Sequence, residues 1–131
     1  MTPIPQLAAI LLLLTNPYAP GAESGVPPSR LRVGVVQMAL GRTIADNRDR
    51  SVAGISYAAA RHVRVAVFPE GALRGTDSDR PAMVEQAVSA IQQAAGKAKL
   101  FVVFGGSTYS AKLKRDANWM RVSGPDGREV F

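Results

Sequence analysis

One carboxylate stands out as a candidate for acid–base chemistry. Glu70 directly follows the apolar run 63–68 and Pro69. Pro69 has a fixed φ angle and favours an extended Phe68, so the strand is expected to end stiffly and to aim Glu70 in one direction. A carboxylate beside an apolar strand end is partly desolvated, which raises its pKa toward the range useful for a general acid or base. The simpler alternative is an exposed glutamate at the rim of a proline-terminated strand.

The other candidate residues favour structural roles. Gln37 ends an apolar run, where an amide side chain more often satisfies the backbone than joins a site. His62 is the only histidine and lies at the end of a predicted helix, which favours a capping role over catalysis. Gly105 and Gly106 lack the Gly-x-Gly-x-x-Gly spacing of a nucleotide-binding loop. Glu70 is therefore the one catalytic candidate.

The sequence contains no cysteine. This excludes disulfides, thiolate metal sites, a thiol nucleophile and a lipoprotein anchor within the 131 residues. We accordingly predict neither a metal nor a cofactor.

The elements that must position Glu70 follow an alternating order. Three segments are apolar on both faces, which is typical of strands covered on both sides: 31–38, 63–68 and 99–106. Between them, residues 46–62 place Val52, Ile55 and Ala59 at helical spacing. A second helix is expected from Pro81, capped by Asp79, stopped by Gly96 and buried along Met83, Ala87, Ile91 and Ala94.

This order predicts an α/β fold with parallel strands and right-handed crossovers. Ligands of such sheets collect outside the carboxyl ends of the strands, which is where Glu70 stands. Residues 118–131 read as two further strands joined by the turn "GPDG".

The first thirty residues differ in composition from the rest. Residues 7–14 form an apolar run of signal-peptide length, shorter than the roughly 20 residues that span a bilayer. We expect a signal peptide over 1–22, a linker over 23–30 and a folded portion over 31–131. This predicts a secreted or periplasmic protein without membrane attachment after signal removal. If the segment is an accidental extension instead, the protein is cytoplasmic.

The charge of the chain is basic but dispersed. The formal net charge is +6, and only the stretch "KLKR" at 112–115 forms a cluster. No aromatic residues interleave with it as stacking platforms for bases would. A solvated loop between strands is favoured over a nucleic-acid contact, so no nucleic-acid partner is predicted.

Several segments resemble, in order and spacing, the N-terminal part of the nitrilase or carbon–nitrogen hydrolase superfamily, and the resemblance covers residues 31–131. They are "RVGVVQM" at 32–38, Asn47, "VAVFPEGAL" at 65–73, "FVVFGG" at 101–106 and "NWMRVSGPDG" at 118–127. The resemblance implies an α-β-β-α sandwich, of which this chain supplies one sheet with its flanking helices. Asn118 matches an asparagine expected to support structure. Thr76 stands where relatives usually have an aromatic residue, so a differently shaped pocket is expected.

The resemblance also implies a reaction. Glu70 matches the glutamate of a Glu-Lys-Cys set that hydrolyses small-molecule amide, nitrile or carbamoyl bonds by covalent catalysis. The lysine and cysteine of the family lie beyond the segments matched here, so this chain is expected to be an inactive N-terminal portion of a carbon–nitrogen hydrolase. The full-length protein is expected to be a homo-oligomer. Substrate identity is left open among nitrile, amide, carbamoyl and acyl-transfer chemistry.

Two further expectations complete the sequence reading. One sheet without its partner exposes an apolar face, so the 131-residue product is expected to be poorly soluble or partly disordered. The alternative function is a non-catalytic, flavodoxin-like α/β binding or interaction module that is complete as it stands.

Overall fold

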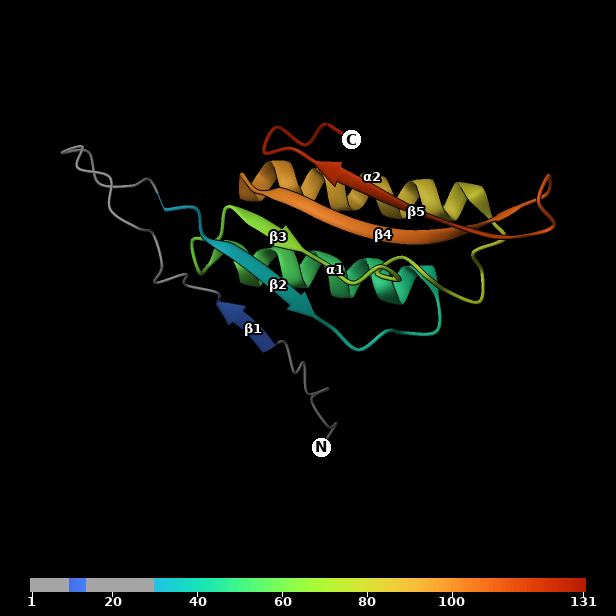
Figure 1. Ribbon diagram of the computed structural model, residues 1–131, viewed down its shortest axis with the longest axis horizontal. Coiled ribbons are helices and arrows are strands. Elements are labelled where there is room, and N and C mark those ends of the chain that lie inside the picture. Colours follow the sequence, from blue (N-terminus) through green and yellow to red (C-terminus); the bar gives the residue numbers. More distant parts are fainter. Residues whose placement is uncertain (1–9, 14–29) are drawn as a thin grey trace, which may run out of the picture.

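The computed structural model describes residues 10–13 and 30–131. Its five strands form one sheet in the order β1-β2-β3-β4-β5, and both helices lie on the same face of that sheet (Figure 1). The predicted α/β architecture of one sheet with flanking helices is confirmed. In chain order the elements are β1 (Ile10–Leu13), β2 (Val33–Gln37), α1 (Ile44–Ala59), β3 (Val65–Val67), α2 (Pro81–Ala98), β4 (Phe101–Ser110) and β5 (Arg115–Ser123).

The centre of the sheet is parallel and its two edges are antiparallel. β2, β3 and β4 run in parallel, with Val33 beside Val65 and Val65 beside Phe101. β1 pairs antiparallel with β2, and β5 pairs antiparallel with β4. Right-handed crossovers between successive neighbours place both helices on one face. A flavodoxin-like sheet carries helices on both faces, and the described residues do not have that arrangement.

The hydrophobic core lies between the two helices and the sheet face that they cover. Strand residues Val102 and Phe104 meet helix residues such as Ile55 and Ile91, and all four are at most 1% exposed. The indole of Trp119 packs edge-on against Phe104, with 6.1 Å between ring centroids. Interdigitated apolar side chains therefore attach both helices to the same sheet face.

α1 begins two residues earlier than the sequence predicts and also ends earlier. Thr43 is its N-cap, and a capping box joins the Thr43 and Asp46 side chains to each other's backbone N–H groups. At its end, His62 takes a left-handed conformation with φ 56°, and its N–H donates to the Ala59 carbonyl. His62 thus lies where the helix stops, as predicted. The buried face includes Ile55 and Ala58 rather than Ala59, together with Asn47 and Ser51.

The predicted start of α2 at Pro81 is confirmed, but its predicted N-cap residue and its predicted end are wrong. Arg80, not Asp79, is the N-cap, and its side chain makes no capping hydrogen bond. The helix also continues past Gly96 to Ala98, and Lys99 takes the left-handed position with φ 57°. A side chain at position 96 would place its Cβ 3.0 Å from the Cα of Gly127. Gly96 therefore permits close packing against a distant turn and does not stop the helix.

The hairpin of β4 and β5 is longer than expected. Residues 111–114 form its exposed turn, so most of the "KLKR" cluster lies in a solvated loop, as predicted. After β5 the chain turns through 124–127 and returns beside it only in an isolated bridge between Ser123 and Glu129 and in hydrogen bonds to Val122. The second predicted strand at the C-terminus is thus reduced to a short backbone contact.

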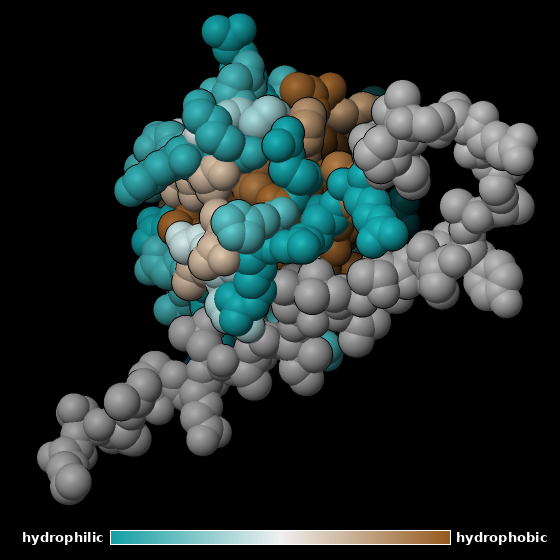
Figure 2. Space-filling model, turned by 90° about the vertical axis from the view of Figure 1, so that its left-hand side faces the viewer, coloured by the Kyte–Doolittle hydropathy of each residue, from teal (hydrophilic) through white to brown (hydrophobic). Residues whose placement is uncertain are grey.

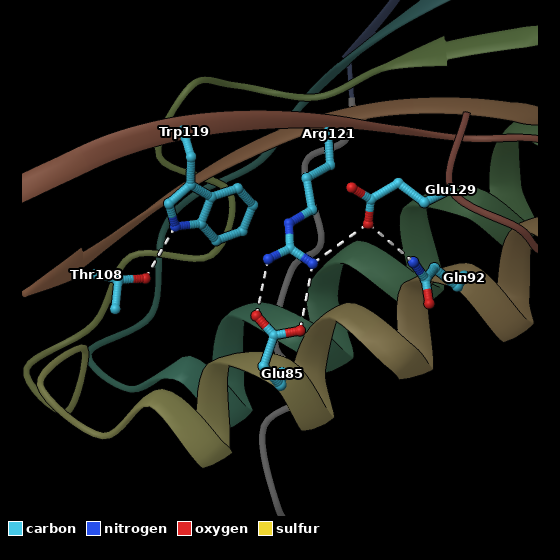
Figure 3. Close-up of polar contacts among 6 residues, drawn as sticks. All are labelled: Glu85, Gln92, Thr108, Trp119, Arg121 and Glu129. Atoms are coloured by element: carbon cyan, nitrogen blue, oxygen red, sulfur yellow. Dashed lines mark hydrogen bonds and ion pairs between the residues drawn. The ribbon is translucent and has the colours of Figure 1, made fainter. Parts of the chain in front are cut away.

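Arg121 joins three segments of the chain on the helix-covered face. Its guanidinium lies 2.8 Å and 3.2 Å from the two carboxylate oxygens of Glu85 on α2, and 3.3 Å from Glu129 after β5 (Figure 3). The guanidinium also lies 5.1 Å from the centroid of the Trp119 ring. Gln92 of α2 donates a hydrogen bond to Glu129. This network fixes β5 and the C-terminal segment to α2.

The opposite face of the sheet has no helix on it within the described residues. Val33, Val35 and Phe101 are 37%, 43% and 38% exposed on this face. Strands predicted to be covered on both sides are therefore covered on one. Viewed from the end at which β2, β3 and β4 begin, hydrophobic residues reach the surface between hydrophilic ones (Figure 2).

The predicted signal peptide and linker lie mostly outside the described residues. The exception within residues 1–22 is β1, which pairs with β2 from Ile10 beside Gln37 to Leu13 beside Gly34. The proposed processing and domain boundaries stay predictions. No helix in the described part of the chain is long and apolar enough to cross a membrane.

Candidate functional site

Glu70 lies in a tight turn just past the carboxyl end of β3, the middle strand of the sheet. The turn is closed by two backbone hydrogen bonds, from Ala72 N–H to the Pro69 carbonyl at 3.0 Å and from Arg74 N–H to the Gly71 carbonyl at 3.0 Å. These two bonds hold the backbone at Glu70 in a defined turn. Its side chain is exposed, however, so the desolvation predicted from the neighbouring apolar strand is not present within the described residues.

Gly105 and Gly106 allow this turn to lie directly on β4. Leu73, which is fully buried, donates its N–H to the Gly105 carbonyl at 2.9 Å. A Cβ at position 105 would overlap the Glu70 carbonyl, and one at position 106 would overlap the Trp119 indole on the other face. The glycine pair is therefore required by close approach on both faces of the strand, a role that sequence reasoning did not find.

Asn118 holds the Glu70 carboxylate directly. Its Nδ2 donates a hydrogen bond to Oε1 of Glu70 at 2.9 Å. Asn118 belongs to β5 and pairs with Ser107 of β4, so the antiparallel hairpin brings it to Glu70 although 48 residues separate them in sequence. Sequence reasoning expected Asn118 to support structure more than chemistry. The structure places it in contact with the candidate catalytic group.

A buried asparagine anchors the loop that follows Glu70. Asn47 is fully buried, and its amide donates to the carbonyls of Gly41 and Arg74 while its Oδ1 accepts the Gly41 N–H at 2.6 Å. The same loop reaches α1 a second time through Asp77, whose carboxylate accepts the N–H of Ile44 at 2.8 Å. These contacts fix the loop that follows the candidate site to α1 and to the loop before it.

Thr76 contributes to the same anchoring. Both its N–H and its hydroxyl donate to the Arg42 carbonyl, at 2.9 Å and 3.2 Å. This residue is hydrogen-bonded to a neighbouring loop and is not among those that line the pocket beside Glu70. Thr76 thus anchors the loop, and the difference in pocket shape expected from it stays a prediction.

A small pocket of about 210 Å³ lies beside Glu70. Ser107 is 1% exposed, and its hydroxyl has no hydrogen-bond partner within the described structure. No histidine or lysine lines the pocket. The pocket offers a carboxylate base, hydrogen-bonding groups and one guanidinium. The residues that line it are Glu70, Gly71, Arg74, Gly106, Ser107 and Asn118.

The remaining sequence candidates lie apart from this pocket. Gln37 is exposed at the end of β2 and His62 is exposed after α1, and neither lines the pocket. No group of three or more His, Asp or Glu side chains in the described ranges is placed to hold a metal ion. The structure therefore brings together Glu70, Asn118, Ser107 and Arg74, of which the sequence had proposed only Glu70 as a site residue.

Solved structures with a fold similar to this chain include a carbon–nitrogen hydrolase and amidases. A carbon–nitrogen hydrolase from Helicobacter pylori G27 matches with a TM-score of 0.62 at 17% identity, over 77% of this chain and 38% of that one. A cysteine-to-serine variant of a nitrilase-superfamily amidase from Nesterenkonia matches with a TM-score of 0.63 at 15% identity, over 82% and 44%. A second variant of that amidase, with a glutamate changed to glutamine and a cysteine to alanine, was solved with acrylamide. It matches with a TM-score of 0.62 at 14% identity, over 82% of this chain and 44% of that one.

No protein-family model matches the sequence, and no curated protein does. The chain spans about two fifths of the length of the solved structures described above. The identities are low, so the likeness concerns the course of the backbone. Within those limits, this chain has the fold of the N-terminal part of the nitrilase-superfamily carbon–nitrogen hydrolases.

Proposed function

We propose that Glu70 is the general base of a hydrolase acting on non-peptide carbon–nitrogen bonds, in an amide, nitrile or carbamoyl group. The observation that carries this proposal is the hydrogen bond from Asn118 to the Glu70 carboxylate inside a pocket at the carboxyl end of the central strand. Similar folds occur in amidases, one of which was solved with acrylamide after a glutamate and a cysteine were replaced.

For an amide, the proposed reaction proceeds by proton transfer through Glu70. The carboxylate takes the proton of a cysteine thiol, and the resulting thiolate attacks the carbonyl carbon to form a tetrahedral intermediate. A lysine ammonium stabilises the negative charge on its oxygen. The carbon–nitrogen bond then breaks, and the departing amine takes the proton from Glu70. Water releases the acyl group from sulfur by the reverse proton transfers.

This chain supplies one of the three groups. It has no cysteine, and no lysine lines the pocket. The nucleophile of the proposed reaction must therefore come from sequence outside these 131 residues. We expect the 131-residue chain on its own to release no ammonia from amides.

The test is to express the chain together with the residues that follow it in its gene. That sequence should contain a lysine and a cysteine, and the product should release ammonia from a simple amide such as acrylamide. Glu70→Gln should reduce kcat/KM by at least about 100-fold, the range found for a lost general base. Glu85→Gln is the matched control, because Glu85 contacts Arg121 on the opposite face of the sheet.

Two results would refute the proposal. One is a following sequence that has no cysteine at all. The other is full turnover by the Glu70→Gln protein.

A further inference from the structure

Basic residues that are dispersed in the sequence gather at one end of the fold. β2, β3 and β4 are parallel and all begin at this end, and both helices end there because each returns the chain to the start of the next strand (Figure 1). Three stretches therefore meet at this end, 30–32, 61–64 and 97–99. We call this surface the basic end, since it carries six cations: Arg30, Arg32, Arg61, Arg64, Lys97 and Lys99.

Backbone hydrogen bonds make the basic end a continuous surface. The Arg64 N–H donates to the Arg32 carbonyl at 2.8 Å, and the Arg64 carbonyl accepts the N–H of Phe101 at 3.0 Å. Adjacent strands lie about 4.8 Å apart, so the stretches that lead into β2, β3 and β4 are direct neighbours. Figure 2 looks onto this end of the molecule, where hydrophilic residues project from several parts of the surface.

No carboxylate in the described structure neutralises these cations. The three stretches contain no Asp or Glu, and none of the ion pairs among the described residues involves the basic end. Asp126 comes close, because its backbone packs against Gly96, but its carboxylate pairs with Arg128. Clustered like charges repel one another, so this arrangement favours an anionic partner.

The ends of the helices account for only part of this charge. Helix C-termini attract cations, and at the end of α1 Arg61 donates to the Tyr57 carbonyl at 3.3 Å while Arg32 donates to the Arg61 carbonyl at 2.8 Å. The Arg61 guanidinium also covers the Tyr57 ring, 3.2 Å from its centroid, so this ring is not free to stack on a base. Arg30, Arg64 and Lys99 have no comparable side-chain contact among the described residues.

We infer that the basic end docks the protein reversibly on an anionic membrane surface, with its cations against the lipid phosphates. Clusters of about four to eight Lys or Arg residues on one surface are typical of binding to anionic headgroups. Leu31 is 65% exposed between Arg30 and Arg32, where its apolar side chain can enter the headgroup layer. The predicted signal peptide joins the folded portion at this same end, so export would bring the basic end to the membrane first.

Docking in this way leaves the pocket beside Glu70 open. That pocket lies past the carboxyl end of β3, whereas the basic end lies at its start. The proposed contact is electrostatic and reversible, which distinguishes it from a membrane span or anchor. It does not depend on the proposed chemistry of Glu70.

Flotation of the 131-residue chain with lipid vesicles tests the inference, because it separates bound chain from aggregates. One vesicle is phosphatidylcholine alone, and the other contains about 30% phosphatidylglycerol as the anionic lipid. Binding to the anionic vesicles should be at least about tenfold tighter, and added salt should remove the difference because it shortens the Debye length. Any binding through apolar segments occurs with both vesicles and so cancels in the comparison.

Two matched sets of substitutions locate the contact. The first set removes three cations from the basic end: Arg64→Gln, Lys97→Gln and Lys99→Gln. The second removes three from the hairpin at the other end of β4: Lys112→Gln, Lys114→Gln and Arg115→Gln. All six residues are exposed, and each set changes one lysine with a left-handed backbone, Lys99 (φ 57°) or Lys114 (φ 50°). The two sets are therefore equal in charge and similar in strain.

The distance between the two ends decides the expected result. β4 has ten residues and separates the ends by about 30 Å, which is about three Debye lengths at about 0.1 M salt. The first set should weaken binding to anionic vesicles by roughly 100-fold, since each basic residue at such a surface contributes about a fivefold change in affinity. The second set should change the affinity by less than about threefold.

Circular dichroism shows whether each variant folds. A pair of double variants repeats the comparison with every strand residue unchanged: Lys97→Gln with Lys99→Gln, against Lys112→Gln with Lys114→Gln. Equal binding to the two vesicles, or an equal loss in the two sets, would overturn the inference. Tighter binding to a DNA duplex than to anionic vesicles at the same salt would also overturn it and would identify nucleic acid as the partner.

Discussion

Two asparagines, Asn47 and Asn118, show how differently one residue type is used around Glu70. Asn47 is fully buried and ties the loop before α1 to the loop after Glu70. Asn118 is exposed and contacts the Glu70 carboxylate. Asn47 therefore stabilises the fold, and Asn118 fixes the direction in which the Glu70 carboxylate points.

We predict that Asn47→Ala lowers the free energy of unfolding by about 2–3 kcal/mol, because it leaves the part-buried backbone groups of Gly41 and Arg74 without their side-chain partner. Asn118→Ala is the control, with an expected change within about 0.5 kcal/mol because its site is exposed. Urea unfolding followed by circular dichroism measures both. An equal loss in the two variants would contradict the separation of their roles.

The sequence identified Glu70 but not the residues around it. Glu70 stands out locally, since an apolar run, a proline and a carboxylate are adjacent. Asn118 and Ser107 reach it through the register of β4 and β5, which no local pattern records. Arg74 follows in the next loop, and only the folded turn shows that it shares the pocket.

At the level of elements, α2 and β5 are joined by a charged contact as well as by the apolar core. Arg121 makes a two-pronged contact with Glu85, is held by Glu129 and lies over Trp119 (Figure 3). Its side chain is 26% exposed, so the contact is only partly open to solvent. Lysine cannot reproduce a two-pronged contact with a carboxylate.

We expect Arg121→Lys to lower the free energy of unfolding by about 1 kcal/mol, near the upper end for partly exposed ion pairs. Arg128→Lys serves as the comparison, since Arg128 is 85% exposed and lies 3.6 Å from Asp126. That change should stay within about 0.5 kcal/mol. Thermal unfolding at low and high salt measures both variants. If 1 M salt does not reduce the difference between them, the contact is not electrostatic.

Element types were predicted more accurately than element ends. The strand–helix alternation follows from apolar periodicity, and the structure has it. The ends depend on packing, as with Gly96, which faces Gly127 inside a continuing helix. The start of α2 at Pro81 was predicted correctly, but its capping residue was not, because Arg80 takes the N-cap position without a capping side-chain hydrogen bond.

At the level of the whole molecule, the sheet face opposite the helices is the dominant surface feature. Val33, Val35 and Phe101 form an exposed row with partly buried valines beside them. Soluble monomers rarely leave a large apolar patch exposed. The physical expectation is association through this face.

We predict that the 131-residue chain associates with increasing concentration, and that Val35→Lys shifts it toward monomer. Ala53→Lys adds the same charge to an exposed site on α1, and it should leave association unchanged. Sedimentation velocity over a range of concentrations measures the effect. A parent chain that is monomeric and unfolds cooperatively would contradict the prediction.

We also propose that the protein is exported, with cleavage after Ala22. The intact mass of the exported product should then correspond to a chain that begins at Glu23. Such cleavage removes β1 (Ile10–Leu13) from the edge of the sheet and exposes β2. Intracellular retention of the uncleaved chain would contradict this proposal.

The sequence by itself determined the α/β alternation, the covered core and the position of Glu70 at a strand end, because each depends on neighbours along the chain. Only the tertiary structure decided that Asn118 holds Glu70, that Arg74 and Ser107 join the pocket, and that no helix among the described residues covers the second sheet face. Those facts depend on strand register and on which segments meet in space. The free energy of such contacts comes from residues far apart in sequence, so no local pattern can specify them.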